Sequence, residues 1–333
     1  MITIHLWGYE STCQPSLISP ESIALYWFLK EEGDRVSRED VEIVFSNNPS
    51  LSPNYHLPLL IDKQEGTVDP KDANDTFKKP ATTTTTTILS GYDNITRYLT
   101  RASDDAMSSA LLQFVADDVG SLTEWALYSN SSNFDGFTRG EHSRLLQCER
   151  RLFLGGASAT SVRASVLKRL NTEEEGEEGE TVTEEATTAP EDLAQSKVFK
   201  LRLENRRQRT KRELRDFTHK IAYLSRLVDA FRRWREATTT AASSSSSSFT
   251  VTTAARLLLR AHLRVQLSLP DTGDAARDRL SAEFSEEFVN GVLQGKSSSS
   301  STTSVHHRAP LYWTETPNFV SSALNWCYYR WSQ

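Results

Sequence analysis

The sequence predicts an α+β fold in which a small mixed sheet comes first and an all-helical region follows. Three observations point to it. Strand-like and helix-like patterns alternate up to residue 99, the apolar periodicity is helical from residue 103 onward, and the breaks are runs of Thr, Ser or Glu. We therefore expect one domain at residues 1–101, a helical domain at 102–296, and a linker with an aromatic C-terminal helix at 297–333.

The first domain opens with a strand, a loop and a capped helix. Residues 2–7 alternate apolar and polar side chains, which is the period of a half-buried strand. Ser19 suits the N-cap of the helix that follows, and Pro20 suits its first position. A second apolar strand is expected at residues 41–45, and the helical crossover between the two strands makes them parallel.

Two short strands and a closing helix complete this domain. The strands are expected at 57–61 and 88–89, and the helix at 92–99. Residues 62–87 are polar and end in six threonines, so we expect an inserted flexible loop there. This order of elements is that of a thioredoxin-like fold, in which the proline before the third strand is usually cis. We therefore expect a cis Leu57–Pro58 bond.

The helical domain is interrupted twice by polar segments. Residues 171–191, which include eight glutamates between 173 and 185, are expected to form a disordered acidic loop, and residues 237–249 are expected to be a Ser/Thr linker. The expected helices are 103–128, 139–153, 162–170, 193–236, 252–267 and 272–293.

One of these helices carries a heptad seam, in which apolar residues recur at steps of three and four. Two heptads are fewer than the three or four that indicate a free coiled coil, so we expect the seam to pack within the domain. A seam that binds a partner protein is the alternative. The seam residues are Leu214, Phe217, Ile221, Leu224, Val228 and Phe231.

Composition excludes several classes of protein. The 333 residues carry a net charge of −6, so no overall positive field attracts nucleic acid. The three cysteines are far apart and give neither a disulfide framework nor a zinc-binding spacing, which fits a reducing compartment. We see no signal peptide, no Arg-rich transit helix, and no run of about 18 apolar residues that would span a membrane.

The strongest enzymatic signal is a thiol motif, Cys13-Gln14-Pro15-Ser16. A reactive thiolate in this fold needs a helix N-terminus close by, and Cys13 lies six residues before the Ser19 cap. We therefore favour an incidental cysteine, with a hydroxyl at Tyr9 or Ser11 as the other candidate. His306 and His307 are adjacent in an expected linker and have no third metal ligand nearby.

A thioredoxin-like domain followed by an all-helical one resembles the architecture of glutathione transferases. Several segments, taken together, also resemble the metaxin family. In the first domain they are 4–8 (IHLWG), 16–19 (SLIS), 22–25 (SIAL), 27–28 (WF), 43–48 (IVFSNN), 57–60 (LPLL), 90–92 (SGY) and 94–95 (NI). In the second they are 193–197 (LAQSK) and 265–271 (VQLSLPD).

The metaxin resemblance implies a non-enzymatic, cytosol-facing subunit of the mitochondrial outer-membrane sorting and assembly machinery, without a cofactor. The implied partners are a barrel-shaped insertase subunit, a second metaxin-like subunit, β-barrel precursors and the outer-membrane translocase. Peripheral membrane contact is also implied, and nucleic acid is not. The alternative is a glutathione-dependent transferase. In those enzymes an acid–serine pair holds the peptide, whereas Gly91-Tyr92 stands at that place here.

Partner contacts are expected at two places. One comprises the Asn47-Asn48 loop and Pro58; for the proline we favour a rigid structural turn, with backbone pairing to an extended peptide, as in this fold, as the alternative. The other is a basic helix segment. Its charge is explained by a solvated helix face, by binding to anionic lipid or acidic partner loops, or by binding to nucleic acid. Its candidate residues are Arg206, Arg207, Arg209 and Arg212. The aromatic tail either docks on the domain or lies at a membrane interface.

Overall fold

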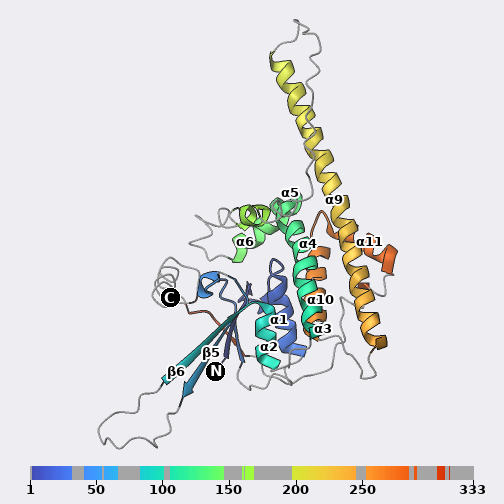
Figure 1. Cartoon of the computed structure of the whole chain (residues 1–333). Coiled ribbons are helices and arrows are strands. Elements are labelled where there is room, and N and C mark those ends of the chain that lie inside the picture. Colours follow the sequence, from blue (N-terminus) through green and yellow to red (C-terminus); the bar gives the residue numbers. More distant parts are fainter. Residues whose placement is uncertain are drawn as a thin grey trace, which may run out of the picture.

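A computed structural model confirms the α+β fold: a five-stranded mixed sheet is followed in the chain by a helical region (Figure 1). The structure describes residues 2–31, 41–54, 56–66, 83–100, 106–145, 160, 162–168, 197–244, 253–284, 289–290, 306–311 and 315. Among these residues, no helix combines the length and the apolar character needed to cross a membrane.

The main sheet has the order β6-β5-β1-β4-β7. Its strands are β1 (Ile2–His5), β4 (Val41–Val44), β5 (Leu59–Gly66), β6 (Thr83–Ser90) and β7 (His306–Arg308). β1 and β4 are parallel, as the helical crossover predicts, with Ile4 opposite Ile43. β1 and β5 are antiparallel, with Ile4 opposite Leu60. These three apolar side chains belong to the core beneath the helices.

Two helices cover one face of this sheet. They are α1 (Pro20–Glu31) and α2 (Tyr92–Thr100). The predicted cap of α1 is confirmed, because the Ser22 amide donates to the Ser19 hydroxyl at 3.3 Å. The predicted cis bond between Leu57 and Pro58 is also present. Local sequence signals therefore determine this part of the fold.

The helical region packs one of its helices, α10 (Thr253–Leu267), against α1. It consists of α3 (Ala106–Phe114), α4 (Gly120–Glu124), α5 (Ser131–Asn133), α6 (Arg139–Leu145), α9 (Lys197–Ser244), α10 (Thr253–Leu267) and α11 (Gly273–Phe284). π-helical turns at Val115–Val119, Trp125–Ser129 and Phe134–Thr138 join the shorter ones. α1 and α10 lie side by side, and Arg260 bridges them by pairing with Glu31 at 2.9 Å and stacking on Trp27. One hydrophobic core therefore runs from the sheet into the helices.

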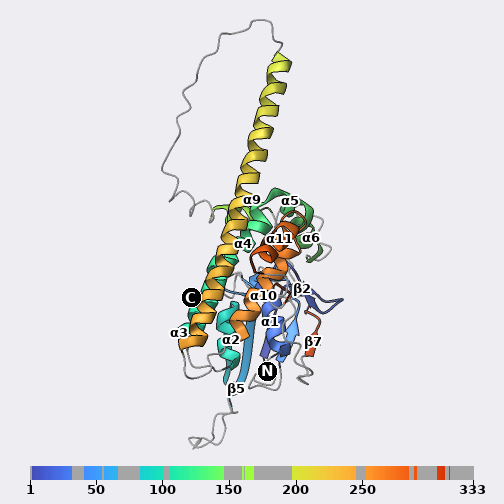
Figure 2. The same cartoon turned by 90° about the vertical axis from the view of Figure 1, so that its right-hand side faces the viewer.

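α9 is unlike the other helices because much of it projects from the body. Its C-terminal part packs beside α4 and α11, while its N-terminal part extends beyond the other helices in both views (Figures 1 and 2). Along the predicted heptad seam, Val228 and Phe231 are buried, but Leu214, Phe217 and Ile221 are exposed. The expectation that the whole seam packs within the domain is therefore wrong for its first three residues.

Two expected polar connections are partly regular structure. Residues 62–66 belong to β5, and 83–87 belong to β6, so a loop over all of 62–87 is incorrect. Threonine is β-branched and suits a strand, and the threonine run pairs with the charged end of β5. Likewise, residues 237–244 continue α9 instead of forming a linker.

The chain also returns to the sheet near its C-terminus. His306 and His307 are part of β7, which pairs in parallel with β4, and not of a linker as expected. Arg308 fixes this strand by pairing with Glu42 at 2.9 Å and with Glu315 at 2.8 Å. The expected acidic loop at 171–191 and the aromatic helix after residue 315 lie outside the described residues.

Candidate functional site

The loop between β1 and α1 is hydrogen-bonded to Asn47, which also contacts the helical region. A Cβ at Gly8 would lie 2.5 Å from the Gln14 carbonyl oxygen, so glycine is required there. Asn47, at a positive φ of 51°, accepts from the Gly8 amide at 2.8 Å and donates to the Gly8 carbonyl at 2.9 Å. Its amide also donates to the Leu145 carbonyl of α6 at 3.3 Å. Asn47 therefore holds the loop against the helical region.

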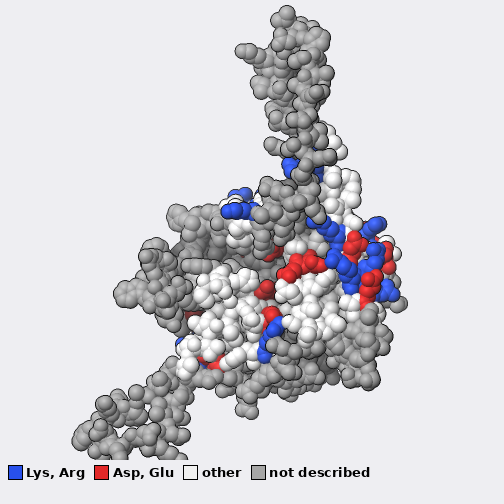
Figure 3. Space-filling view, viewed as in Figure 1, with Lys and Arg blue, Asp and Glu red and all other residues white. Residues whose placement is uncertain are grey.

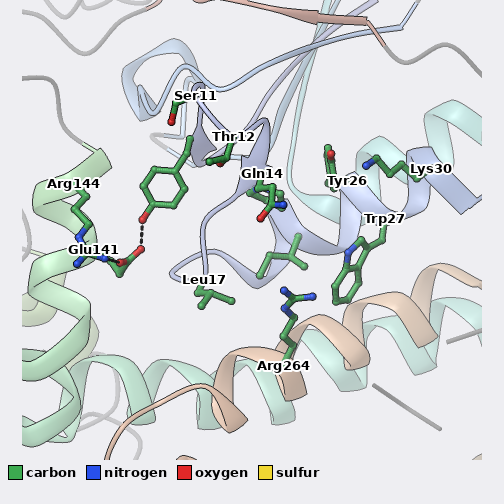
Figure 4. A pocket seen from close by; sticks show the side chains of 13 residues that line it. Ser11, Thr12, Gln14, Leu17, Tyr26, Trp27, Lys30, Glu141, Arg144 and Arg264 are labelled. Carbon is green, nitrogen blue, oxygen red and sulfur yellow. Dashed lines mark hydrogen bonds and ion pairs between the residues drawn. The ribbon is translucent and has the colours of Figure 1, made fainter. Parts of the chain in front are cut away.

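Tyr9 makes a second connection between this loop and α6. Its hydroxyl donates to the carboxylate of Glu141, which also pairs with Arg144 at 2.7 Å (Figure 4). Burial, together with the hydrogen bond and the negative charge of Glu141, raises the pKa of Tyr9 to about 12. The hydroxyl is thus protonated at neutral pH and its proton is already used by Glu141. It is poorly placed to stabilise a thiolate.

A cavity of about 660 Å³ opens between this loop, α1, α6 and α10 (Figure 4). Its volume is within the range of small-molecule sites. Arg264 points into it from α10, and Lys30 lies over the Tyr26 ring at 4.4 Å. The lining residues are Tyr9, Ser11, Thr12, Gln14, Pro15, Leu17, Ile23, Tyr26, Trp27, Lys30, Glu141, Arg144 and Arg264. The lining mixes apolar and polar side chains and carries three cationic groups against one carboxylate, so the cavity can bind an anionic or amphipathic group.

Cys13 does not face this cavity as a nucleophile. It sits in the turn of the hairpin formed by β2 (Gly8–Tyr9) and β3 (Gln14–Pro15), and its thiol points to the Glu10 carbonyl at 3.5 Å. Tyr26 donates its hydroxyl to the Cys13 carbonyl at 2.9 Å, which fixes the backbone of the turn. The α1 N-terminus is capped by Ser19 instead. An incidental role for Cys13 stays a prediction.

The place where glutathione transferases grip their peptide is used for packing here. Gly91 has a φ of 87° and donates its amide to the Pro58 carbonyl at 3.0 Å. Tyr92 is buried and donates its hydroxyl to the Ala254 carbonyl at 2.8 Å. This turn therefore connects the sheet to α10 and offers neither a carboxylate nor a free hydroxyl to a ligand.

A smaller cavity of about 300 Å³ lies at the N-terminus of α1. Glu21 stands at this positive helix end, 3.8 Å from the ring of His56, and burial raises the pKa of the Glu21 carboxyl. Burial also lowers the pKa of His142 to about 4 and that of His262 to about 3, so both rings are neutral at pH 7. No cluster of three metal-ligating side chains occurs in the described part of the chain.

The predicted contact residues fall in two separate places. Asn47 lies between the Gly8 loop and α6, while Asn48 is 1% exposed and caps the turn at Pro49–Leu51 by accepting from the Ser50 amide at 3.2 Å. Pro58 is buried. The four basic candidates, Arg206, Arg207, Arg209 and Arg212, lie on the projecting part of α9, and for these four the structure describes the backbone alone. Contact with a partner stays a prediction for all seven.

Sequence reasoning missed Glu141, the acceptor for Tyr9. The two residues are 132 positions apart, and nothing in the pattern around Glu141 distinguishes it from other helical glutamates. It also missed the contact of Asn47 with Leu145, because Asn47 reads as a turn residue.

Comparison with protein families gives two matches, which together cover most of the chain. Residues 22–155 match the family described as outer mitochondrial membrane transport complex protein, and residues 172–329 match the Tom37 C-terminal domain. No curated protein matches the chain.

Proposed function

Because the chain belongs to the Tom37 family of outer mitochondrial membrane transport complex proteins, we propose that it is a non-catalytic, cytosol-facing subunit of the sorting and assembly machinery. In this role it supports the insertion, folding and release of β-barrel precursors and stabilises the complex. Its partners are the barrel-shaped insertase subunit and a second metaxin-like subunit. The mechanism is one of binding and positioning.

One observation supports this proposal above the others. In the corner where a transferase activates its thiol substrate, the Tyr9 hydroxyl is committed to Glu141, a carboxylate of α6. Asn47 and Tyr92 also form connections across the same boundary. Polar side chains at the position of a transferase active site thus connect the sheet to the helices, which suits a structural subunit.

The test is affinity purification of the tagged full chain from detergent-solubilised mitochondria. We expect an outer-membrane barrel protein and a second metaxin-like protein to co-purify in similar amounts. An untagged strain processed in parallel is the control for non-specific recovery. If the chain is recovered as a monomer under conditions that keep the barrel complex intact, the assembly function is wrong.

The alternative function, a glutathione-dependent transferase, is tested separately. With Gly91-Tyr92 in place of the acid–serine pair, we expect no retention of the protein on a glutathione matrix and no conjugation of a standard electrophile. Retention that is released by free glutathione would favour the transferase. A known transferase run on the same matrix serves as the positive control.

A further inference from the structure

The projecting part of α9 carries an apolar stripe that the described structure leaves exposed. Leu214 is 63% exposed, Phe217 61% and Ile221 53%. Two turns further along the same seam, Val228 is 5% exposed and Phe231 is 1% exposed. Three large apolar side chains in a row on one helix are a concentrated exposed patch, and such patches usually mark an interaction site.

The spacing of the stripe indicates what kind of surface covers it. Leu214, Phe217 and Ile221 continue the alternating spacing of three and four residues found in the buried part of the seam. The stripe therefore occupies only two positions of each heptad. A stripe restricted to these two heptad positions is the narrow seam of helix-on-helix packing. A face that inserts into a membrane interface is wider. The geometry therefore favours another helix as the occupant.

The exposed stripe ends at Ile221, one residue after Lys220, and Tyr223 is the next buried side chain. The Lys220 ammonium donates to the Asp271 carbonyl at 2.8 Å and to the Asp271 carboxylate at 3.1 Å, which ties α9 to the turn before α11. N-terminal to this tie, α9 extends past its neighbours (Figures 1 and 2). A partner helix would thus cover the exposed part of the seam, as the helices of the body cover Val228 and Phe231.

Charge indicates which helix fits. Residues 197–215 contain nine Lys or Arg and two Glu, so the projecting part is strongly cationic. Nearer the body the surface changes: Lys, Arg, Asp and Glu lie intermixed over α9 and α11 (Figure 3), and Arg232 pairs with both Asp229 and Glu283. The unbalanced positive charge lies at 197–212, directly N-terminal to the stripe, and it favours a partner helix that continues beside those residues with acidic flanks.

We propose that Leu214, Phe217 and Ile221 form a docking seam for one amphipathic helix of another protein. That helix carries apolar residues at heptad spacing and acidic residues on both flanks. A second copy of this chain is a poor occupant because two cationic helices would repel each other. The acidic segment at 173–185 of the same chain is also a poor one, since Val182 is its only large apolar residue. This inference does not depend on the proposed function.

A designed peptide tests the seam directly on the full-length protein. The probe is a fluorescein-labelled helical peptide of three heptads with Leu at positions a and d and Glu at e and g. We expect saturable binding by anisotropy, and we expect Phe217→Asp to weaken it about tenfold or more, because a buried aromatic anchor becomes a charge. The matched control is Ala222→Asp, which adds the same charge at an exposed position that is neither on the seam nor at its flanks.

Two further measurements make the result decisive. Because Phe217 is exposed, both variants should keep the wild-type melting temperature, so weaker binding cannot be attributed to unfolding. A peptide with Lys in place of Glu should bind much more weakly than the acidic one. Equal binding of the acidic peptide by wild type and Phe217→Asp would overturn the proposal. Binding to anionic vesicles or self-association that Phe217→Asp abolishes, without peptide binding, would overturn it in favour of a lipid surface or a second copy.

Discussion

The two halves of the α9 seam have the same sequence pattern and opposite environments. Val228 and Phe231 pack among the helices of the body, with the Phe231 ring 6.3 Å from that of Phe284. Leu214 and Phe217 are of the same chemical type, at the same spacing, and are mostly exposed. The heptad pattern determines that one face of α9 seeks apolar contact, but it does not determine which molecule provides the contact.

This difference has a physical origin in the length of the neighbours. α10 has 15 residues and α11 has 12, whereas α9 has 48. At 1.5 Å per residue, neither of the shorter helices can cover the whole length of α9. The exposed half therefore contributes little to the stability of the isolated chain. Substitutions in the buried half should lower the free energy of unfolding, and those in the exposed half should leave it nearly unchanged.

The largest expected effect is on global stability. Phe231→Ala should reduce the free energy of unfolding by about 3–5 kcal/mol, because it leaves a cavity in the core. Phe217→Ala should change it by about 0.5 kcal/mol or less, since its ring is already largely exposed. Urea denaturation followed by circular dichroism measures both. Similar losses for the two variants would contradict the assignment of one half to the core and the other to the surface.

Mild acid should also affect the body and spare the projecting part. Burial lowers the pKa of His262 to about 3, below the ordinary value of 6.5. Between these pH values the unfolded chain binds a proton that the folded chain does not, so stability is full above pH 6.5 and falls as the pH decreases. For His262 alone the loss approaches about 1.4 kcal/mol per pH unit. His5 and His142, with pKa values lowered to about 4, act in the same direction.

Urea midpoints between pH 6.5 and 5 measure this effect, because most carboxylates remain ionised there. His262→Gln should show a smaller decrease than wild type, while Phe217→Ala should show the same decrease. Stability that is independent of pH over this interval would mean that the three rings are hydrated in the folded state.

Local signals in the sequence determined the N-terminal elements. Alternation placed β1, and the Ser19-Pro20 pair placed the start of α1. The threonine run was misread because low complexity is typical of loops, whereas in the fold these residues form β6, which pairs with β5. Strand formation there depends on pairing with a distant segment, and no single window of sequence contains that information.

The candidate site was predictable only in part, for a similar reason. The loop at Tyr9 and Cys13 could be located from the chain order of strand and helix. The acceptor of the Tyr9 hydroxyl could not be predicted, because Glu141 belongs to a helix 132 residues further along the chain. The strand formed by His306 and His307 is likewise set by Arg308, which joins Glu42 and Glu315 across the fold.

The smallest expected effect concerns the point where the two halves of the seam meet. Burial alone would raise the pKa of the Asp271 carboxyl, but hydrogen bonds from Asn130 and Lys220 outweigh it and lower that pKa. Lys220→Met removes one of these partners and keeps most of the apolar stem. Because the pair is partly exposed, at 26% and 35%, we expect a loss of only about 0.5 kcal/mol in global stability.

Its local effect should be larger than its global one. Removing the Lys220–Asp271 tie takes away a link between this helix and the turn before α11, so amides N-terminal to Lys220 should exchange faster with deuterium while those around Phe231 keep their protection. Arg226→Met, on the exposed side of the same helix, is the matched control and should leave both regions unchanged. Faster exchange around Phe231 in Lys220→Met would mean that the two halves of α9 unfold as one unit. The two halves would then differ in solvent exposure but not in local stability.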